Sequence, residues 1–373
     1  MRIISVETFL VPPRLLFLRI GTDTGIVGWG EPIVEGRART VRAAIDEMAS
    51  LLLGADPRRI EDLWQTMTRG TFYRGGPVLS SAVAGVDQAL WDITGQALGA
   101  PVHALLGGAV RSRVRVYAAA HGPTPAALAA DATRLVALGY TAVKIGPPGS
   151  LSYLPAPHEL VARVAAVRAA VGPSIDVALD LHGRASLPFS RRLLPLLEPH
   201  FPLFVEEPVR PEYADQVAAL AGPVPLALGE RLYDRRAFRA VLDAGVAVVQ
   251  PDPSHAGGIS EVRRIAAVAE MYDAVVAPHC PLGPIALAAC LQLDATIPNF
   301  LVQEQSLGVH APADIPFVRD PSVFAMSEGH LRVLTDPGLG IEVDEDAVRA
   351  ADRVGHDWRA PIDHHTDGSF AEW

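Results

Sequence analysis

The first hundred residues combine short strand-like runs with longer helical patterns. The runs "RIISVETFLV" and "RLLFLRIGTDTGIVGWGEP" predict strands, with "TDTG" as a turn between two of them. Helical patterns follow near 40–53, 58–68 and 78–98, and in the last one apolar residues recur at helical spacing. This order predicts an α+β domain that opens with an antiparallel sheet.

From about residue 113 the pattern changes to β-rich runs that alternate with alanine-rich helical stretches. The runs are "RVRVYAAA", "TAVKIG", "IDVALDL", "PLFVEEP", "PLALGE", "VAVVQPD", "AVVAPHC" and "FLVQEQ", and helices are expected in the gaps, for example at 157–171, 234–244 and 259–271. Eight strands alternating with helices predict a parallel barrel, with a doubly wound open sheet as the structural rival. We therefore expect a first domain at 1–112, a barrel at 113–320 and a return segment at 321–373 that packs on the first domain.

Polar residues end all but the first of these apolar runs. From Asp180 to Glu304 they recur at steps of 26, 24, 22, 27 and 25 residues, about one strand–helix unit each. In a parallel barrel the carboxyl ends of all strands meet on one face, where the active site lies. Taken singly, each residue could instead cap a helix or solvate a loop. As a set they predict one polar mouth, formed by Lys144, Asp180, His182, Glu206, Glu207, Glu230, Asp252, His279 and Glu304.

Three of these carboxylates come from successive strands, namely Asp180, Glu206 and Glu230. Carboxylates that converge in a partly dry site repel each other unless a cation sits between them. Oxygen ligands suit a hard ion such as Mg²⁺, which keeps open positions for water or substrate oxygens. Glu207 follows a candidate ligand directly, so in a strand its side chain is expected to point to the opposite face.

Composition narrows the partners and the compartment. The chain has 373 residues and a formal charge of −10, without a basic run, which disfavours nucleic acid and anionic membranes as partners. No apolar run is long enough for a membrane span and no secretory signal is visible, so we expect a cytoplasmic protein. Cys280 and Cys290 are too few for a disulfide framework, and their spacing is not that of a zinc site. Lys144 is the only lysine in the sequence.

Several motifs together resemble the enolase superfamily, in its mandelate racemase subgroup. They are "DLHGR", "FVEEP", "GER", "QPDPSHAGGI", "APHCPLGPIALAACLQ" and "QEQSLGVH", with "VGWGEPIVEGRARTV" and "FYRGGP" in the first domain. The resemblance is greatest to the D-galactonate dehydratase family and covers nearly the whole chain. It implies a modified TIM barrel, (β/α)7β, under an N-terminal α+β capping domain that the C-terminal segment completes.

The resemblance also implies a site and a reaction. Mg²⁺ is expected on Asp180, Glu206 and Glu230, which would make the enzyme a Mg²⁺-dependent sugar-acid dehydratase acting on an aldonic acid, D-galactonate foremost. Removal of the proton next to the carboxylate and loss of water would give a 2-keto-3-deoxy acid. The remaining implied roles are a His279–Asp252 dyad as general base, His182 as general acid and Glu304 as an oxyanion or substrate-binding partner. Family members are commonly oligomeric, so a homo-oligomer is expected.

Three other interpretations stay open, and the first is a dehydratase of the same superfamily that acts on another acid sugar. A racemase or epimerase of the same superfamily is expected to carry a Lys-x-Lys pattern at the second strand, whereas here Lys144 is followed by Ile145 and Gly146. Lys144 alone could still act as the base on the opposite side of the substrate. It could also stabilise the substrate carboxylate or pair with a metal ligand. A non-catalytic binding protein on the same barrel is the alternative from another class. Such a protein is expected to lack a ligand or a base, and none is missing.

Some positions depart from the D-galactonate dehydratase pattern or have no assigned role. Gly146 stands where that family tends to have asparagine, and segments 118–125, 147–158 and 363–368 look unlike it. The chemistry of five further side chains would allow a contact with the mouth, but the sequence gives none of them a role: Arg37, Tyr73, Arg74, His121 and His255. The adjacent Ser254 could instead cap the helix that follows.

Overall fold

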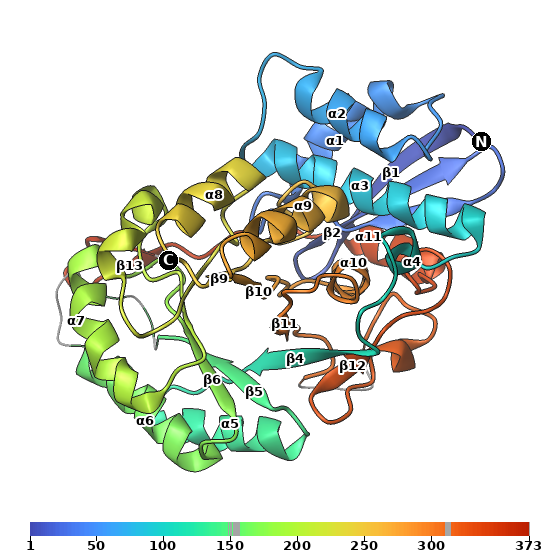
Figure 1. Cartoon of the computed structure of the whole chain (residues 1–373). Helices are drawn as coiled ribbons and strands as arrows, with labels where there is room; N and C mark the ends of the chain where they lie inside the picture. The colour runs from blue at the N-terminus through green and yellow to red at the C-terminus, as the bar shows by residue number, and fades with distance from the viewer. Residues whose placement is uncertain (148, 150, 152–156, 310–314, 373) are drawn as a thin grey trace.

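The chain folds into a capping domain beside a barrel of parallel strands (Figure 1). The structure is a computed structural model and describes residues 1–147, 149, 151, 157–309 and 315–372. In Figure 1 the cap carries the N-terminus at the upper right, and the barrel with its outer helices lies below and to the left of it.

The cap opens with an antiparallel sheet of three strands, which confirms the predicted opening. They are β1 (Ile3–Val11), β2 (Leu15–Thr22) and β3 (Val27–Gly30), and the helices after them are α1 (Ala38–Leu52), α2 (Ile60–Arg69), α3 (Gly76–Leu98) and the short α4 (Val102–Leu105). Helix α3 packs directly on β3, because a Cβ atom on Gly30 would lie 2.0 Å from the carbonyl oxygen of Gly85. Glycine is therefore required in β3 for this close approach.

In the described part of the chain, eight parallel strands form the barrel, as predicted. They are β4 (Arg113–Ala119), β5 (Ala142–Ile145), β6 (Asp176–Asp180), β7 (Val205–Glu206), β8 (Leu226–Leu228), β9 (Val248–Val249), β10 (Val275–Val276) and β11 (Gln303–Glu304). Neighbouring strands are consecutive from β4 to β10, and β11 pairs with β4. A parallel bridge between Val276 and Phe300 joins β10 to the segment before β11, so the sheet returns to its start. This order excludes the doubly wound open sheet.

A helical segment follows each barrel strand from β4 to β10. These are α5 (Pro125–Ala137), α6 (His158–Val171), α7 (Leu187–Leu197) with η1 (Glu198–His200), η2 (Pro211–Leu220), α8 (Arg235–Asp243), α9 (Gly258–Glu270) and α10 (Pro284–Asp294). Side-chain oxygens of Thr124, Ser186 and Asp234 accept backbone N–H groups at the starts of α5, α7 and α8. Such caps satisfy N–H groups that have no partner inside the helix, so these helices begin at set points beyond the strand ends.

The barrel interior is a small apolar cluster separate from the main core. It consists of Tyr117, Ala142, Ala178, Phe204, Ala227, Val248, Ala277 and Val302. Two large aromatic rings share this space with alanines, and the rings of Tyr117 and Phe204 meet edge to face with centroids 6.5 Å apart. The interior is therefore filled beneath the mouth, as in other small closed barrels.

The C-terminal segment returns to both parts of the molecule. Its elements are η3 (Pro321–Phe324), β12 (His330–Arg332), α11 (Glu345–Val354), β13 (Asp363–His364) and β14 (Phe370–Ala371). Strand β12 pairs antiparallel with β4 of the barrel. Helix α11 lies on β1, where the backbone N–H of Leu10 donates to Asp352 at 2.7 Å, and Glu372 pairs with Arg210 at 3.3 Å. The expected domain limits of 1–112, 113–320 and 321–373 stay predictions.

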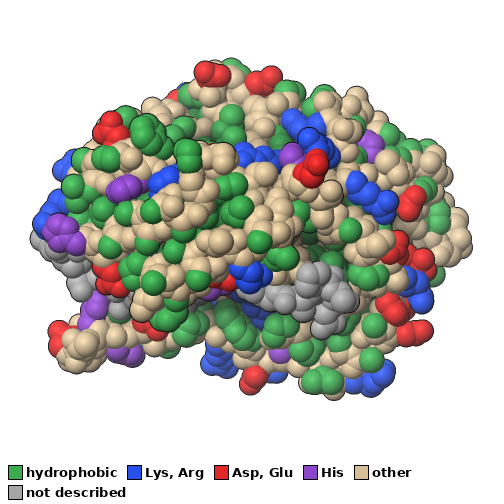
Figure 2. Space-filling model, turned by 90° about the horizontal axis from the view of Figure 1, so that it is seen from below, with side chains coloured by type: hydrophobic (Ala, Val, Ile, Leu, Met, Phe, Trp, Pro, Cys, Tyr) green, Lys and Arg blue, Asp and Glu red, His purple; other side chains and the backbone are tan. Residues whose placement is uncertain are grey.

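The face in Figure 2 carries positive and negative side chains interspersed among apolar ones. Within the described part of the chain, no helix combines the length and the apolar character needed to cross a membrane.

Candidate active site

A cavity of about 980 Å³ lies at the carboxyl ends of the barrel strands. Six of the residues predicted for the mouth line it: Lys144, Asp180, His182, Glu230, His279 and Glu304. Glu206 and Asp252 are buried directly behind them, in contact with Lys144 and His279. The structure thus brings together all eight side chains that we expected to bind metal or catalyse.

The three predicted metal ligands form one cluster. Asp180, Glu206 and Glu230 each offer a carboxylate oxygen, and these oxygens all lie within 4.8 Å of one another. Their strands β6, β7 and β8 are neighbours in the sheet, which explains the convergence. Burial, and then the charge of Asp180, hold the pKa of Glu206 well above its usual value. The cluster therefore has the oxygen donors and the mutual repulsion that a hard divalent cation would relieve.

Lys144 lies at the centre of these carboxylates. Lys144 lies in β5, one residue before the strand ends, and is 6 % exposed. Its Nζ is 2.7 Å from Glu304 Oε1, 3.1 Å from Glu206 Oε2 and 3.2 Å from Asp180 Oδ2. Burial opposes its charge, but Glu206 and Glu304 hold the pKa of Lys144 well above the usual value. The side chain is thus a buried ammonium, and it also lies 5.4 Å from the ring centre of Tyr117 below.

His279 and Asp252 form a hydrogen-bonded dyad. Nδ1 of His279 is 2.8 Å from Asp252 Oδ2, so this nitrogen carries the proton and Nε2 faces the cavity, 3.6 Å from Glu230 Oε2. Burial opposes protonation, but Glu230 and the Asp252 hydrogen bond hold the pKa of His279 well above the usual value. Next to the imidazole, the N–H of Cys280 donates to Glu304 Oε2 at 3.0 Å, which fixes the last strand-end carboxylate.

His182 approaches the same cavity from the other side. It follows β6, which lies four strands from β10 in either direction round the barrel, so His182 and His279 come from opposite walls. Nε2 of His182 is 3.0 Å from Asp180 Oδ2, and its backbone N–H donates to Asp180 Oδ1 at 2.8 Å. Its φ of 52° is unusual for a residue other than glycine, and this left-handed turn directs the side chain back to the mouth.

Glu207 is buried and lies outside the metal cluster, as expected, but strand alternation is not the cause of its position. Strand β7 ends at Glu206, and Glu207 has a φ of 47°, so the alternation of a strand does not apply to it. Its carboxylate lies 3.5 Å from Nη2 of Arg231. Burial, and then the charge of Glu230, raise the pKa of Glu207 to about 8. We assign this residue to the support of the β8 loop.

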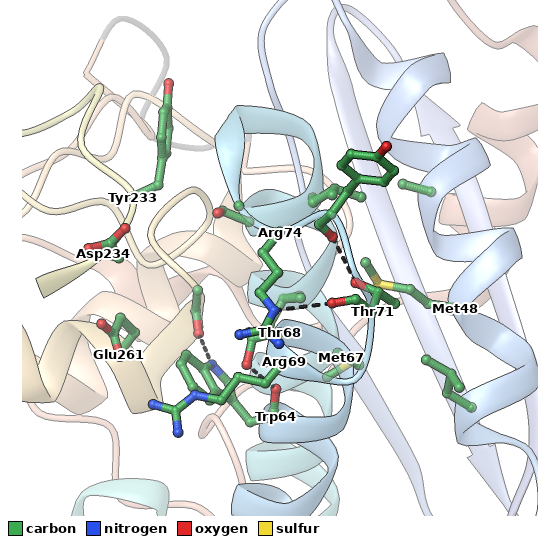
Figure 3. A pocket seen from close by; sticks show the side chains of 18 of the residues that line it. Met48, Trp64, Met67, Thr68, Arg69, Thr71, Arg74, Tyr233, Asp234 and Glu261 are labelled. Atoms are coloured by element: carbon green, nitrogen blue, oxygen red, sulfur yellow. Dashed lines mark hydrogen bonds between the residues drawn. The ribbon is translucent and has the colours of Figure 1, made fainter. Parts of the chain in front are cut away.

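Most of the residues without assigned roles line one of two cavities. His121, Gly146 and His255 line the mouth. Tyr73 and Arg74 line a separate cavity of about 570 Å³ between the cap helices and the start of α8, where Arg74 donates to the carbonyl of Thr71 (Figure 3). Arg37 lines neither cavity. Of the unusual segment 147–158, residues 148, 150 and 152–156 lie outside the described residues.

Sequence reasoning missed several residues around the mouth. Arg14, Glu35, Arg184, Arg231 and Tyr233 line it. Arg184 and Arg231 stand just after strand ends in "HGR" and "GER", so their position was a usable signal. Arg163 is buried on α6, and its Nη2 donates to the carbonyl of Gly122 at 2.8 Å, which holds the loop after β4. Its place on the apolar face of the predicted helix was the signal there.

Comparison with known proteins identifies the family. Residues 4–107 match the mandelate racemase/muconate lactonizing enzyme N-terminal domain, and residues 127–347 match the enolase C-terminal domain-like family. Full-length relatives named D-galactonate dehydratase include those of Ralstonia nicotianae (50% identical) and Variovorax paradoxus (51% identical), with 100% of each chain covered.

Solved structures agree with this assignment. An enolase from Agrobacterium radiobacter, crystallised with Na and L-malate, superposes with a TM-score of 0.92 at 32% identity over 100% of both chains. An enolase superfamily member from Salmonella Typhimurium gives 0.88 at 30% identity over 93% of this chain and 97% of that one. The chain therefore belongs to the enolase superfamily, and within its mandelate racemase/muconate lactonizing enzyme group to the D-galactonate dehydratase family of hydro-lyases.

Proposed function

We propose that this enzyme is a Mg²⁺-dependent dehydratase of an aldonic acid, D-galactonate foremost, and that its product is the 2-keto-3-deoxy acid. The observation that carries the proposal is the placement of two imidazoles on opposite walls of one cavity, with three converging carboxylates between them in strand order. The names of the full-length relatives support the choice of D-galactonate.

The described residues fit a Mg²⁺ ion. Asp180, Glu206 and Glu230 supply only oxygen donors, and three of them leave positions open for water or for substrate oxygens. When bound, the ion would polarise the substrate carboxylate and offset the charge of an ene-diolate. It would also offset the charge of Glu230 beside His279, which favours the neutral imidazole that a base requires.

His279 is proposed to remove the proton next to the carboxylate. Asp252 accepts from Nδ1, which fixes the tautomer and leaves Nε2 as the proton acceptor towards the cavity. As this C–H bond breaks, its electron pair enters the carboxylate and negative charge gathers on two oxygens. A correctly placed general base contributes about 10²–10⁴-fold to the rate.

Lys144 is proposed to hold this charged end of the substrate, and Glu304 is proposed to bind a substrate hydroxyl. The pKa of Lys144 lies far above neutrality, so its ammonium can stabilise the oxygens that gain charge. Burial opposes ionisation of Glu304, but Lys144 and His279 hold its pKa below the usual value. A carboxylate accepts hydrogen bonds, so of its two expected roles, contact with a substrate hydroxyl is the one that this ionisation favours.

His182 is proposed to complete the elimination. Its imidazolium donates a proton to the hydroxyl on the neighbouring carbon, the C–O bond breaks, and water leaves with that bond's electron pair. The electron pair from the broken C–H bond forms the C=C bond of an enol, which rearranges to the 2-keto-3-deoxy acid. Simple racemisation does not require a general acid at the position of His182.

Racemisation or epimerisation remains the alternative activity, and the contacts of Lys144 weigh against it. A second base must be neutral, whereas the ammonium of Lys144 pairs with three carboxylates within 3.2 Å. A screen of purified protein with Mg²⁺ against aldonic and aldaric acids, measuring 2-keto acid formation and loss of optical rotation separately, tests the proposal. Absence of 2-keto acid from every substrate would refute it.

Removal of divalent metal is expected to abolish dehydration. Without a cation, Glu206 and its neighbours repel both one another and the incoming substrate carboxylate. Chelation and gel filtration should reduce 2-keto acid formation to background, and added Mg²⁺ should restore it. The matched control is the same treatment followed by Mg²⁺ and excess chelator together. Turnover that persists in metal-free buffer would contradict the metal assignment.

Gly146→Asn is expected to tighten the binding of D-galactonate. Among the described residues, a Cβ atom at Gly146 meets only the carbonyl oxygen of Asp180, at 3.7 Å, and the φ of Gly146 lies outside the left-handed region, so a side chain fits beside them. One added hydrogen bond of about 1 kcal/mol would lower KM roughly fivefold. Gly146→Ala is the control, because it adds the Cβ without a polar group. Equal KM values for the two variants would show that the asparagine makes no contact with substrate.

A further inference from the structure

His255 is a buried histidine that the proposed reaction steps leave without a role. It is 5 % exposed and lies in the loop between β9 and α9, three residues after Asp252. Its Nε2 is 3.3 Å from Asp252 Oδ2, the same oxygen that lies 2.8 Å from His279 Nδ1. One carboxylate oxygen is therefore shared by two imidazoles.

The other nitrogen of His255 points into the capping domain. Nδ1 is 3.3 Å from the hydroxyl oxygen of Ser81, which lies on α3 and is fully buried. Because Asp252 can only accept, Nε2 of His255 carries a proton towards it. In the neutral ring Nδ1 is then an acceptor, and the Ser81 hydroxyl donates to it. A directed hydrogen-bonded chain thus runs from Ser81 through His255 to Asp252.

The loop that carries His255 is also held by other residues of α3. Nε2 of Gln88 donates to the carbonyl of Pro253 at 2.9 Å and to Ser254 Oγ at 3.2 Å. Asp87 accepts the N–H of Ser260 at 2.9 Å and its hydroxyl at 2.6 Å. These contacts fix the backbone on both sides of His255, so removal of its imidazole need not release the loop.

The contribution of His255 is therefore specific to the Asp252 side chain. Oδ1 of Asp252 accepts the N–H of Ser254 at 2.6 Å, and Oδ2 is directed by the two imidazoles. Loss of one of these donors leaves Oδ2 with a single partner and lets the carboxylate rotate. Burial opposes ionisation of Asp252, but His255 and His279 hold its pKa below the usual value.

We infer that His255 is a positioning residue that links cap helix α3 to the catalytic base: Ser81 sets its tautomer, and its Nε2–H orients Asp252 on His279. The inference rests on the proposed function, in which His279 removes the α-proton. If the cap orients the Asp252–His279 dyad in this way, His279 would be a fully effective base only when the cap and the barrel are packed together. Glu35 Oε2, 3.7 Å from the same Nε2, places a second cap residue at this junction.

The test compares His255→Asn with His255→Gln, both assayed with Mg²⁺. The glutamine amide nitrogen reaches about as far as imidazole Nε2, whereas the asparagine amide reaches only as far as Nδ1. Replacing an outer-shell partner of a metal-bound histidine typically costs about 10–100-fold, and we expect a similar loss of kcat in His255→Asn, with KM within about threefold. His255→Gln should recover most of kcat. Exchange of the substrate α-proton in D2O should fall in parallel with kcat.

A spectroscopic readout makes the test independent of turnover. In ¹⁵N-histidine-labelled protein with Mg²⁺, the His279 Nδ1–H bonded to Asp252 should give a strongly downfield proton resonance. It should shift or broaden in His255→Asn and in Ser81→Ala, and persist in His255→Gln. If wild-type protein dehydrates no sugar acid, the proposed function fails, whereas this signal still reports on the positioning role.

Three outcomes would overturn the inference. One is an unchanged resonance in both His255→Asn and Ser81→Ala. Another is an equal loss of kcat in the asparagine and glutamine variants, which would indicate packing and not hydrogen bonding. The third is a raised KM at unchanged kcat, which would place His255 on the substrate. If His255→Asn does not fold, Ser81→Ala carries the test alone, because it removes one buried hydroxyl and leaves both imidazoles in place.

Discussion

His279→Asn should lose both dehydration and exchange of the substrate α-proton, each by about 10³-fold. The asparagine amide can still meet Asp252 from the level of Nδ1, but no acceptor remains at the position of Nε2, which faces the cavity. A general base is worth about 10²–10⁴-fold, so its removal is among the largest single losses that this site can show. Both rates can be followed in one NMR experiment in D2O, from loss of the α-proton signal and appearance of product.

The matched control is His330→Asn. This histidine lies in β12, which pairs with β4 near Arg115, at the end of the barrel away from the mouth. The same substitution there should leave kcat and KM unchanged. Exchange that survives in His279→Asn at near the wild-type rate would show that another group removes the proton, and Lys144 would then have to be reconsidered as a base.

His182→Asn should separate the two halves of the reaction. It is expected to retain α-proton exchange within about tenfold and to lose dehydration by about 10²–10⁴-fold, because only departure of the hydroxyl needs the acid. Asparagine is among the residues that best tolerate a left-handed backbone, so the φ of 52° at this position is preserved. The backbone N–H that binds Asp180 is also unchanged by the substitution.

The opposite pattern would refute the role of His182. If the variant dehydrates normally but exchanges slowly, His182 acts in proton removal and not in proton donation. Metal content should be measured alongside, because Nε2 of His182 is 3.0 Å from Asp180, a proposed Mg²⁺ ligand. Loss of both rates together with loss of Mg²⁺ would place the defect in the metal site, and His182 would have no demonstrated role as acid.

The strands and the candidate chemistry could be predicted because both are local patterns. Each barrel strand is a short buried run, and the residue that ends it lies at the mouth whatever the loop beyond it does. The steps from Asp180 to Glu304 therefore carried enough information to place six side chains on one face. Because the strands are parallel, their carboxyl ends all lie at the same end of the barrel, and this brings the side chains together.

Loop residues were harder to predict, because their direction depends on backbone conformation. Strand alternation explains the burial of Glu207 only if the strand continues, and its φ of 47° shows that it does not. Tyr73 and Arg74 have the chemistry to bind a sugar acid, yet the turn before α3 places them on the 570 Å³ cavity between cap and barrel. Neither outcome follows from spacing along the chain.

By itself, the sequence predicted the eight alternating strands and helices, the polar residues at the strand ends and the isolation of Lys144 as the single lysine, because periodicity and composition record which positions are buried. Only the tertiary structure decided that Lys144 pairs with three carboxylates and that the cap reaches the base through His255. Ser81 and His255 are 174 residues apart. No local pattern connects such a pair, because their contact exists only once α3 has packed against the barrel.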